Sequence, residues 1–311
     1  MFAKDKRLAI FLPCLVILLS ICSYFFPEVI TDYRYYFLAV AMLTLGIPHG
    51  AIDHIISANI YELDFSLSDQ MRFYSVYMGL MVFMALVWFI NGALGFLIFA
   101  AITIYHFGQA DVEHISMNTL LKRIIIFSRG IMVFSLILFF DIEFTYPVIA
   151  SVVDISLLQE GWMMSNGITL GVVLGFQYPI LLLSIMIVKQ KYTRSWLYLV
   201  LDSLLVILLF YANHTIIAFS VYFALWHSYG HILEMKQYLQ SVNQRLTISK
   251  FYKLAAPFTI LSLLGLTVIY LLANAIGMEN QMVALLFVLV SVLTLPHVVV
   301  VQKMFSRAHH Q

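Results

Sequence analysis

Charged side chains are scarce in this sequence. Lysine, arginine, aspartate and glutamate make up 11% of its 311 residues, while 62% of the residues are hydrophobic. A soluble domain is nearer about a quarter charged and about half apolar. The mean hydropathy of the chain is +0.95. This shortage of charge excludes a soluble globular domain and indicates a protein that crosses a membrane several times.

Cysteine is also rare, and the net charge is small. The only two cysteines, Cys14 and Cys22, lie in the first apolar run, a placement that argues against a disulfide scaffold or a thiolate metal site. The formal net charge is +1, so no basic surface for nucleic acid is predicted. The amino end has a basic start and an apolar centre but no small-residue cleavage site, and we interpret it as a retained first helix.

Apolar runs separated by polar breaks predict the helices. A helix needs about 20 residues to cross the hydrocarbon core. The sequence gives about ten spans, or eight or nine if the tight breaks at Asn91-Gly92 and Asn213-His214 do not separate helices. The predicted spans are roughly 8–26, 37–57, 73–90, 92–112, 124–141, 167–188, 196–212, 214–234, 254–275 and 281–302. We therefore predict an all-α, polytopic transmembrane helical bundle that forms a single integral membrane domain over residues 1–311.

Lysine and arginine orient this bundle, because basic residues are retained on the cytoplasmic side of a membrane. With the amino end inside, 15 of the 17 basic residues fall in inner segments; Arg34 lies outside and Arg129 within a span. The long predicted outer loop 142–166 contains acidic residues but no lysine or arginine. Both termini are therefore predicted to be cytoplasmic.

Five of the ten histidines lie well inside predicted spans, whereas His54 lies near the end of the second span and His214 at an outer break. These five are His49, His106, His227, His231 and His297. All of them fall on even-numbered spans and, at about 1.5 Å of rise per residue, within one layer about 10 Å thick. Polar side chains buried in a bilayer are costly unless they meet a partner, an ion or a cavity. One shared site explains this common depth better than five separate ones.

The segment WHSYGH strengthens the prediction of a metal site. His227 and His231 are four residues apart, so on a helix they share one face with Cβ atoms about 5–6 Å apart. Such a pair alone is a weak signal, but His49 and His106 lie at the same depth. An all-imidazole site suits Fe, Zn, Cu or Ni, and the lack of cysteine argues against an iron–sulfur cluster. An open position for oxygen would favour Fe(II), but the residues leave the metal open.

Neighbouring polar residues are predicted to support the ligands. A metal-bound imidazole usually donates its other N–H to a carboxylate or a carbonyl. Asp53 is four residues from His49, and Gln109 is three from His106, so each can reach back along a helix face. For His297 we weigh a fifth ligand, a cavity lining and a hydrogen-bonding partner of the ligands, and predict the last.

Two prolines stand directly before histidines. Pro48 and Pro296 are expected to kink their helices and to free carbonyl groups toward a cavity. Asp111 and Glu234 lie nearer the membrane surface, where the simplest interpretation is a solvated helix end. The histidine segments therefore look like openings in helices that present polar groups inward.

Four motifs resemble those of the bacteriorhodopsin-related protein family (Brp/Blh). They are GIPHGAIDH (46–54), YHFGQAD (105–111), WHSYGH (226–231) and LPHVVVV (295–301). The resemblance runs from about residue 40 to 303. That family comprises membrane β-carotene 15,15′-dioxygenases, which cleave the central double bond of β-carotene with O2 to give two molecules of retinal.

The resemblance implies a site and a setting. In the family four histidines hold ferrous iron, and the motifs place them at His49, His106, His227 and His231. It also implies a carotenoid substrate dissolved in membrane lipid, Fe(2+) as cofactor, and delivery of retinal to a rhodopsin. The expected location is the cell membrane of a bacterium or archaeon, as a multi-pass protein.

Two other functional classes stay open. One is another membrane histidine–metal oxidase, such as a desaturase, but desaturases have tight histidine clusters near the surface, and the histidine motifs here are sparse. The other is a haem- or metal-binding transport protein. Bis-histidine haem would leave the pair at 227 and 231 without a purpose. Transport would favour ionisable residues spread through the depth of the membrane, and here Arg129 and Asp202 are nearly alone.

Overall fold

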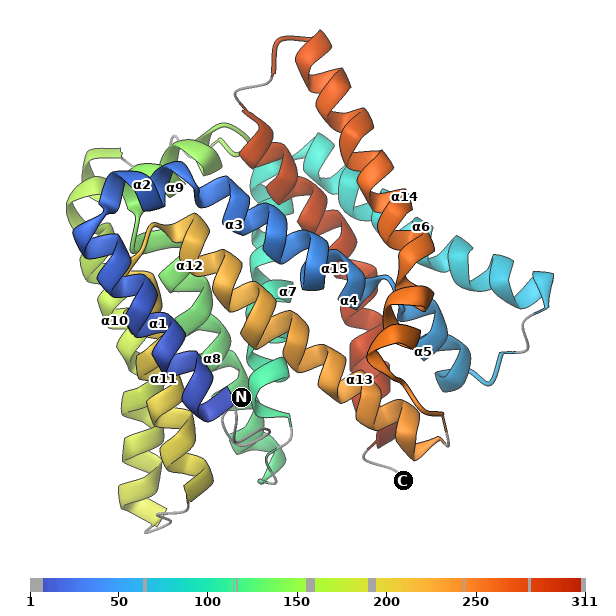
Figure 1. Ribbon diagram of the computed structural model, residues 1–311, viewed down its shortest axis with the longest axis horizontal. Helices are drawn as coiled ribbons and strands as arrows, with labels where there is room; N and C mark the ends of the chain where they lie inside the picture. Colours follow the sequence, from blue (N-terminus) through green and yellow to red (C-terminus); the bar gives the residue numbers. More distant parts are fainter. Residues whose placement is uncertain are drawn as a thin grey trace. The chain divides into compact units, whose positions relative to one another are not determined.

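Helices make up the regular structure of the described part of the chain (Figure 1). The computed structural model describes residues 8–63, 66–113, 115, 117–154, 160–189, 194–242, 244–278 and 281–308. Within these residues the regular elements are α- and π-helices, with no strand. The predicted all-α class is confirmed.

Nine helical segments among the described residues are long and apolar enough to cross a membrane. They are α1 (Leu8–Phe25), the segment Arg34–Ile60, α6 (Leu67–Ile90), α7 (Gly92–Val112), α10 (Glu160–Lys189), α11 (Arg194–Ala212), the segment Thr215–Ser241, α14 (Ile248–Ala275) and α15 (Met282–Ala308). A tenth results if α8 (Thr119–Phe139) and α9 (Ile142–Ala150), which meet at 91°, form one broken span. The predicted polytopic helical bundle is confirmed, with nine or ten spans.

Both tight breaks predicted from the sequence are helix ends. Asn91 ends α6, and its side-chain oxygen accepts a hydrogen bond from the Leu94 N–H at 2.9 Å in the first turn of α7. At the second tight break, Asn213-His214, His214 is the N-cap of α12 (Thr215–Val221), and its Nδ1 accepts from the Ile216 N–H at 3.2 Å. Side-chain acceptors of this kind satisfy the N–H groups that a helix start leaves without partners. These residues therefore separate neighbouring spans.

Two of the long segments are interrupted by π-helical turns. Arg34–Ile60 consists of α3 (Arg34–Ala41), η1 (Met42–Gly46), α4 (Ile47–Gly50) and α5 (Asp53–Ile60). Thr215–Ser241 consists of α12 (Thr215–Val221), η2 (Tyr222–Ser228) and α13 (Tyr229–Ser241). A short helix, α2 (Pro27–Asp32), links α1 to α3. The interrupted segments are the two that carry the GIPHGAIDH and WHSYGH motifs.

The chain divides into two compact units. Unit 1 comprises Met1–Ala41, Ile104–Tyr146 and Leu158–Gly230; unit 2 comprises Met42–Thr103, Pro147–Leu157 and His231–Gln311. Three of the divisions fall inside helices, so α7, α9 and α13 each contribute residues to both units. The single integral membrane domain and the cytoplasmic termini stay predictions.

In unit 1, helices α7 and α8 approach closely through two glycines. A Cβ atom at Gly130 would lie 1.7 Å from the Ile104 carbonyl oxygen, and one at Gly108 would lie 1.8 Å from the Ile126 carbonyl oxygen. Small residues permit such close backbone contacts between membrane helices. Because His106 lies between Ile104 and Gly108 on α7, this crossing holds the helix at the position of a predicted ligand.

In unit 2, an apolar cluster joins helices α5, α13, α14 and α15. Its buried members are Ile52, Ile56, Ile60, Met235, Tyr238, Leu239, Leu246, Phe251, Ala255, Val300, Val301, Met304 and Phe305. The same helices carry Asp53, His231 and His297 a few residues away. The cluster therefore provides the packing that holds these polar groups in place.

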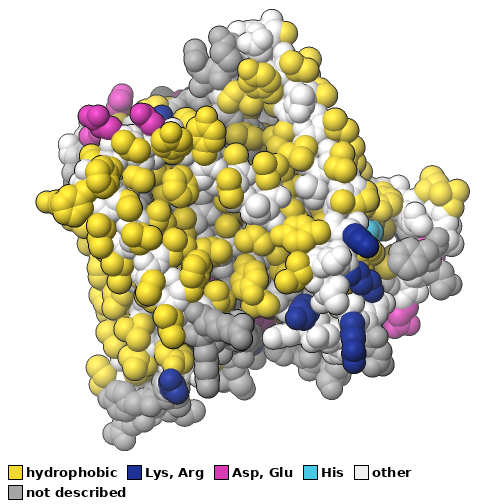
Figure 2. All heavy atoms as spheres, viewed as in Figure 1, with side chains coloured by type: hydrophobic (Ala, Val, Ile, Leu, Met, Phe, Trp, Pro, Cys, Tyr) yellow, Lys and Arg dark blue, Asp and Glu magenta, His cyan; other side chains and the backbone are white. Residues whose placement is uncertain are grey.

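Hydrophobic side chains also cover most of the face shown in Figure 2. Phe89 is 89% exposed and Val188 is 77% exposed. A soluble monomer rarely exposes apolar patches of more than a few hundred square ångströms, whereas lipid chains solvate such side chains without cost. This surface is that of a multi-pass membrane protein.

Candidate metal centre

The π-helical turns lie at two of the predicted ligands. His227 lies inside η2, and His49 follows η1 by three residues. A π-turn inserts an extra residue into a helix and is frequently found at functional sites. Pro48 lacks the N–H that would bond the Thr44 carbonyl in an α-helix, and the Tyr252 hydroxyl donates to this carbonyl instead, at 2.9 Å. The predicted opening of carbonyl groups toward a cavity at Pro48 and Pro296 stays a prediction.

In unit 1, two predicted ligands lie side by side. The rings of His106 on α7 and His227 on η2 have centroids 4.9 Å apart at an angle of 78°. Phe107 and Phe223 border the His227 ring, with centroid distances of 4.7 and 5.1 Å. Both histidines are buried. Aromatic rings therefore shield this imidazole pair from water.

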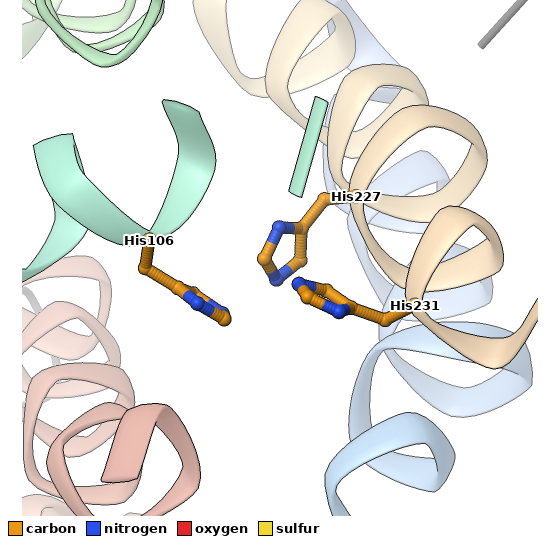
Figure 3. A group of neighbouring side chains, drawn as sticks. All are labelled: His106, His227 and His231. Atoms are coloured by element: carbon orange, nitrogen blue, oxygen red, sulfur yellow. The ribbon is translucent and has the colours of Figure 1, made fainter. Parts of the chain in front are cut away.

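His231 joins this pair through the helix that carries His227. The segment Thr215–Ser241 continues from η2 into α13, and His231 follows four residues after His227 (Figure 3). One ligand atom from each of His106, His227 and His231 lies within 4.8 Å of the others. The exposed fractions of the three residues are 1%, 2% and 0%. Three of the four predicted ligands thus form one buried group.

This group has the donor chemistry that a transition metal requires. Imidazole nitrogen suits Fe, Zn, Cu and Ni. At a metal–nitrogen distance of about 2.1 Å, two ligands of one ion lie at most about 4.2 Å apart. Shifts of about half an ångström would allow the three histidines to share an ion. The group is therefore suited to bind a metal.

In unit 2, His49 and His297 lie close together and near His231. The ring centroids of His49 and His297 are 4.9 Å apart, and the His231 ring is 6.1 Å from His49 and 5.9 Å from His297. Within the described residues His49 is not a member of the three-histidine group. Its predicted role as a fourth ligand stays a prediction.

The Nδ1 atoms of His49 and His297 face oxygen acceptors. The His49 Nδ1 donates to the carbonyls of Gly46 and Leu45, the latter at 3.3 Å. The His297 Nδ1 donates to the Asp53 carboxylate at 3.0 Å. A carbonyl or carboxylate partner places the proton on Nδ1 and leaves the lone pair on Nε2, which is the arrangement typical of a metal-binding imidazole.

The predicted supporting residues have the following partners. Asp53 accepts from His297, and the Tyr77 hydroxyl donates to the same carboxylate at 3.0 Å. Gln109 Nε2 donates to Glu113 at 3.2 Å. Asp53 therefore supports His297, a residue distant in sequence, while the role predicted for Gln109 beside its ligand stays a prediction.

Two acidic residues differ from their simplest interpretation. Asp111 and Glu234 are buried rather than solvated helix ends. Glu234 Oε2 lies 3.3 Å from His231 Nδ1, and Asp111 accepts from Arg129 at 2.7 Å. Sequence reasoning missed the second contact, although a lone arginine inside an apolar span is a signal that a buried acid must lie nearby.

His214 has a structural position apart from this group. It caps α12, lies between two spans, and has its Nδ1 3.6 Å from Asp141. Burial lowers the pKa of His214, and the Asp141 carboxylate opposes that shift. The neutral ring is the form that accepts the Ile216 N–H, so this histidine serves the helix start.

The fold and these histidines define a class: a multi-pass helical membrane protein that buries an imidazole group suited to a metal. Comparison with known proteins is more specific. The model of the β-carotene 15,15′-dioxygenase family matches residues 40–305, and the chain belongs to this family. A relative from Halobacterium salinarum, described as a probable β-carotene 15,15′-dioxygenase Blh, is 25% identical over 295 residues, which cover 86% of this chain and 83% of the relative. No solved structure matches the chain.

Proposed function

We propose that this protein cleaves the central 15,15′ double bond of β-carotene with O2 and releases two molecules of retinal. In this reaction one C=C bond is replaced by two C=O bonds and each product takes one oxygen atom, so no further reductant is required. Membership of the dioxygenase family supports this reaction. The observation that carries the proposal is the buried group of His106, His227 and His231 in such a chain.

We further propose that His49 joins these three residues as ligands of one Fe(II). The ion would supply the activation of O2 that an apolar polyene cannot provide. Imidazole-only coordination suits Fe(II), and neither cysteine lies in a histidine motif. The Gly46 and Leu45 carbonyls place the His49 proton on Nδ1, so Nε2 would be the atom that binds the ion.

The residues around the histidines would hold the substrate and keep water out. β-Carotene is a long apolar rod dissolved in lipid, so it reaches the site from within the membrane. Phe107 and Phe223 border the His227 ring, and aromatic faces pack well against a polyene. An error of about 1 Å in placing the reacting bond can cost about a hundredfold in rate. Retinal released into the cell membrane would then be taken up by a rhodopsin.

Expression in cells that accumulate β-carotene tests the proposal. The wild-type chain should bleach the yellow colour and produce retinal, measured by chromatography of cell extracts. Replacing any one of His49, His106, His227 or His231 with alanine should abolish cleavage and lower the iron content of the purified protein. The loss is expected because each substitution removes one donor from a site of four.

His214→Asn is the matched control, because asparagine also caps a helix and His214 caps α12 outside the three-histidine group. This variant should keep cleavage and iron content unchanged. Full cleavage by all four alanine variants would overturn the ligand assignment. A Soret band in the absorbance spectrum of the purified protein would instead indicate haem.

A further inference from the structure

Unit 1 contains a buried ion group formed by three helices. Arg129 on α8 donates from Nε to Asp111 on α7 at 2.7 Å, and from Nη2 to Asp202 on α11 at 2.9 Å. All three side chains are buried, and the Tyr178 ring faces the guanidinium at 5.5 Å. A buried ion group is costly to form and strongly destabilising to break, so it fixes the three helices relative to one another.

The π-helical turn η2 is bonded to this ion group at two positions. The Trp226 Nε1–H donates to Asp202 Oδ1 at 2.9 Å, and the Tyr222 hydroxyl donates to Asp111 Oδ2 at 3.4 Å. Trp226 immediately precedes His227 in the chain. The residue next to the predicted ligand His227 is therefore bonded to a separate helix, α11.

Hydrogen bonds to a neighbouring helix can fix the side-chain directions of a π-turn. A π-turn departs from the regular hydrogen-bond register of an α-helix, so its side-chain directions depend more on outside contacts. Bonds to a charged acceptor are roughly twice as strong as bonds between neutral groups. Arg129 needs only one carboxylate for neutrality, but two lie beside it, and each also accepts from the π-turn, Asp111 from Tyr222 at 3.4 Å and Asp202 from Trp226 at 2.9 Å. The shorter of the two bonds, to Asp202, involves the residue next to His227.

We propose that Asp202 is a positioning residue for His227. It acts through the Trp226 side chain, and the Arg129–Asp111 pair holds it in place. The proposal rests on the proposed function, in which His227 binds the metal. Loss of the Trp226 bond should let the π-turn rotate and move the His227 ring away from the other two imidazoles. The first property to change is then metal affinity rather than folding.

Two tryptophans provide a matched experiment. Trp226→Phe removes the N–H bond to Asp202. Trp88→Phe removes an equivalent buried bond, from Trp88 Nε1 to the Ser291 hydroxyl at 2.6 Å in unit 2. Titration of the metal-free proteins with ferrous iron gives the affinity, and thermal unfolding of the same samples gives the stability.

Trp226→Phe is expected to weaken iron binding by about tenfold or more, the range found for residues that orient ligands. Trp88→Phe is expected to leave the iron affinity unchanged. It should lower the melting temperature by about as much as Trp226→Phe does, because each variant loses one buried hydrogen bond. Equal iron affinity in Trp226→Phe and wild type, or equal losses in the two variants, would overturn the proposal.

Two variants at Asp202 separate the acceptor from the charge. Asp202→Asn and Asp202→Ala both remove one negative charge, but only asparagine retains an oxygen that can accept from Trp226. Asp202→Asn should bind iron more tightly than Asp202→Ala. Equal affinities of these two variants would overturn the role of Asp202, and this test holds even if Trp226→Phe does not fold. A wild-type protein that binds no ferrous iron overturns the proposed function itself. Normal wild-type binding with unaffected variants overturns only the role of Asp202.

Discussion

At the scale of single residues, the hydrogen bonds of the imidazoles decide which nitrogen can bind a metal. His297 and Asp53 are far apart in the chain, yet the carboxylate accepts the Nδ1–H of the ring at 3.0 Å. Tyr77 donates to the same carboxylate. Because the His297 ring lies 4.9 Å from that of His49, this three-residue chain orients one imidazole beside a predicted ligand.

Replacing Asp53 with asparagine should lower iron affinity by about tenfold, because the amide holds the imidazole proton less strongly than a carboxylate does. Tyr77→Phe should have a smaller effect, since Asp53 keeps its bond to His297. Iron titration of the metal-free protein measures both changes. Tyr74→Phe, one turn earlier on α6, is the matched control and should match wild type. An Asp53→Asn protein with unaltered affinity would contradict this role.

At the scale of elements, two departures from regular α-helix place the predicted ligands. The spacing of His227 and His231 indicates one helical face, but the structure has a π-turn through the first and an α-helix at the second. At His49 a π-turn and Pro48 break the helix together. A π-turn has no clear signature in composition or spacing, so the altered directions of these side chains depend on the packing around them.

The crossing of α7 and α8 is the element contact most sensitive to substitution. Gly130→Ala would place a Cβ 1.7 Å from the Ile104 carbonyl, so the helices must separate, and the destabilisation should be about 3 kcal/mol or more. Thermal unfolding of the purified protein measures this loss. Iron affinity should fall as well, because α7 carries His106.

Gly79→Ala on α6 is the control for this prediction. A Cβ at Gly79 would meet nothing within 4 Å. Alanine is favoured over glycine in a helix by up to about 1 kcal/mol, so this variant should be as stable as wild type or slightly more so. If Gly130→Ala and Gly79→Ala both had the melting temperature of the wild type, the close approach of α7 and α8 would be refuted.

At the scale of the whole molecule, the number of spans determines the sides of the membrane on which the termini lie. Nine crossings place them on opposite sides, and ten place both on one side. The difference depends on α8 and α9, which meet at 91°. The one-sided distribution of the basic residues, 15 of 17 in predicted inner segments, favours ten.

Reporter fusions test this orientation. A reporter that fluoresces only in the cytoplasm should be active at both the amino and the carboxyl end, and a reporter active only outside should be active within residues 142–166. Exchanging the two reporters provides the control, since each should then be silent. Activity of the cytoplasmic reporter at one end alone would indicate nine crossings and contradict the predicted topology.

The local sequence determined the class, the spans and the chemistry of the candidate ligands. Runs of apolar residues are local and long, so they predict α1 and the carboxyl end of α6 within a residue, although α6 begins six residues before its predicted start. The common depth of the five histidines is likewise predicted from the position of each one along its own span. These features require no knowledge of which helices are neighbours.

Only the tertiary structure decided which groups meet. Asp111, Arg129 and Asp202 come from three helices, and Asp53 pairs with His297 across most of the chain. Such contacts depend on how helices cross and on where π-turns rotate a side chain, and neither is set by the residues of one segment. Burial then makes each pairing obligatory, because a charge inside a membrane protein must find its partner wherever the fold has placed it.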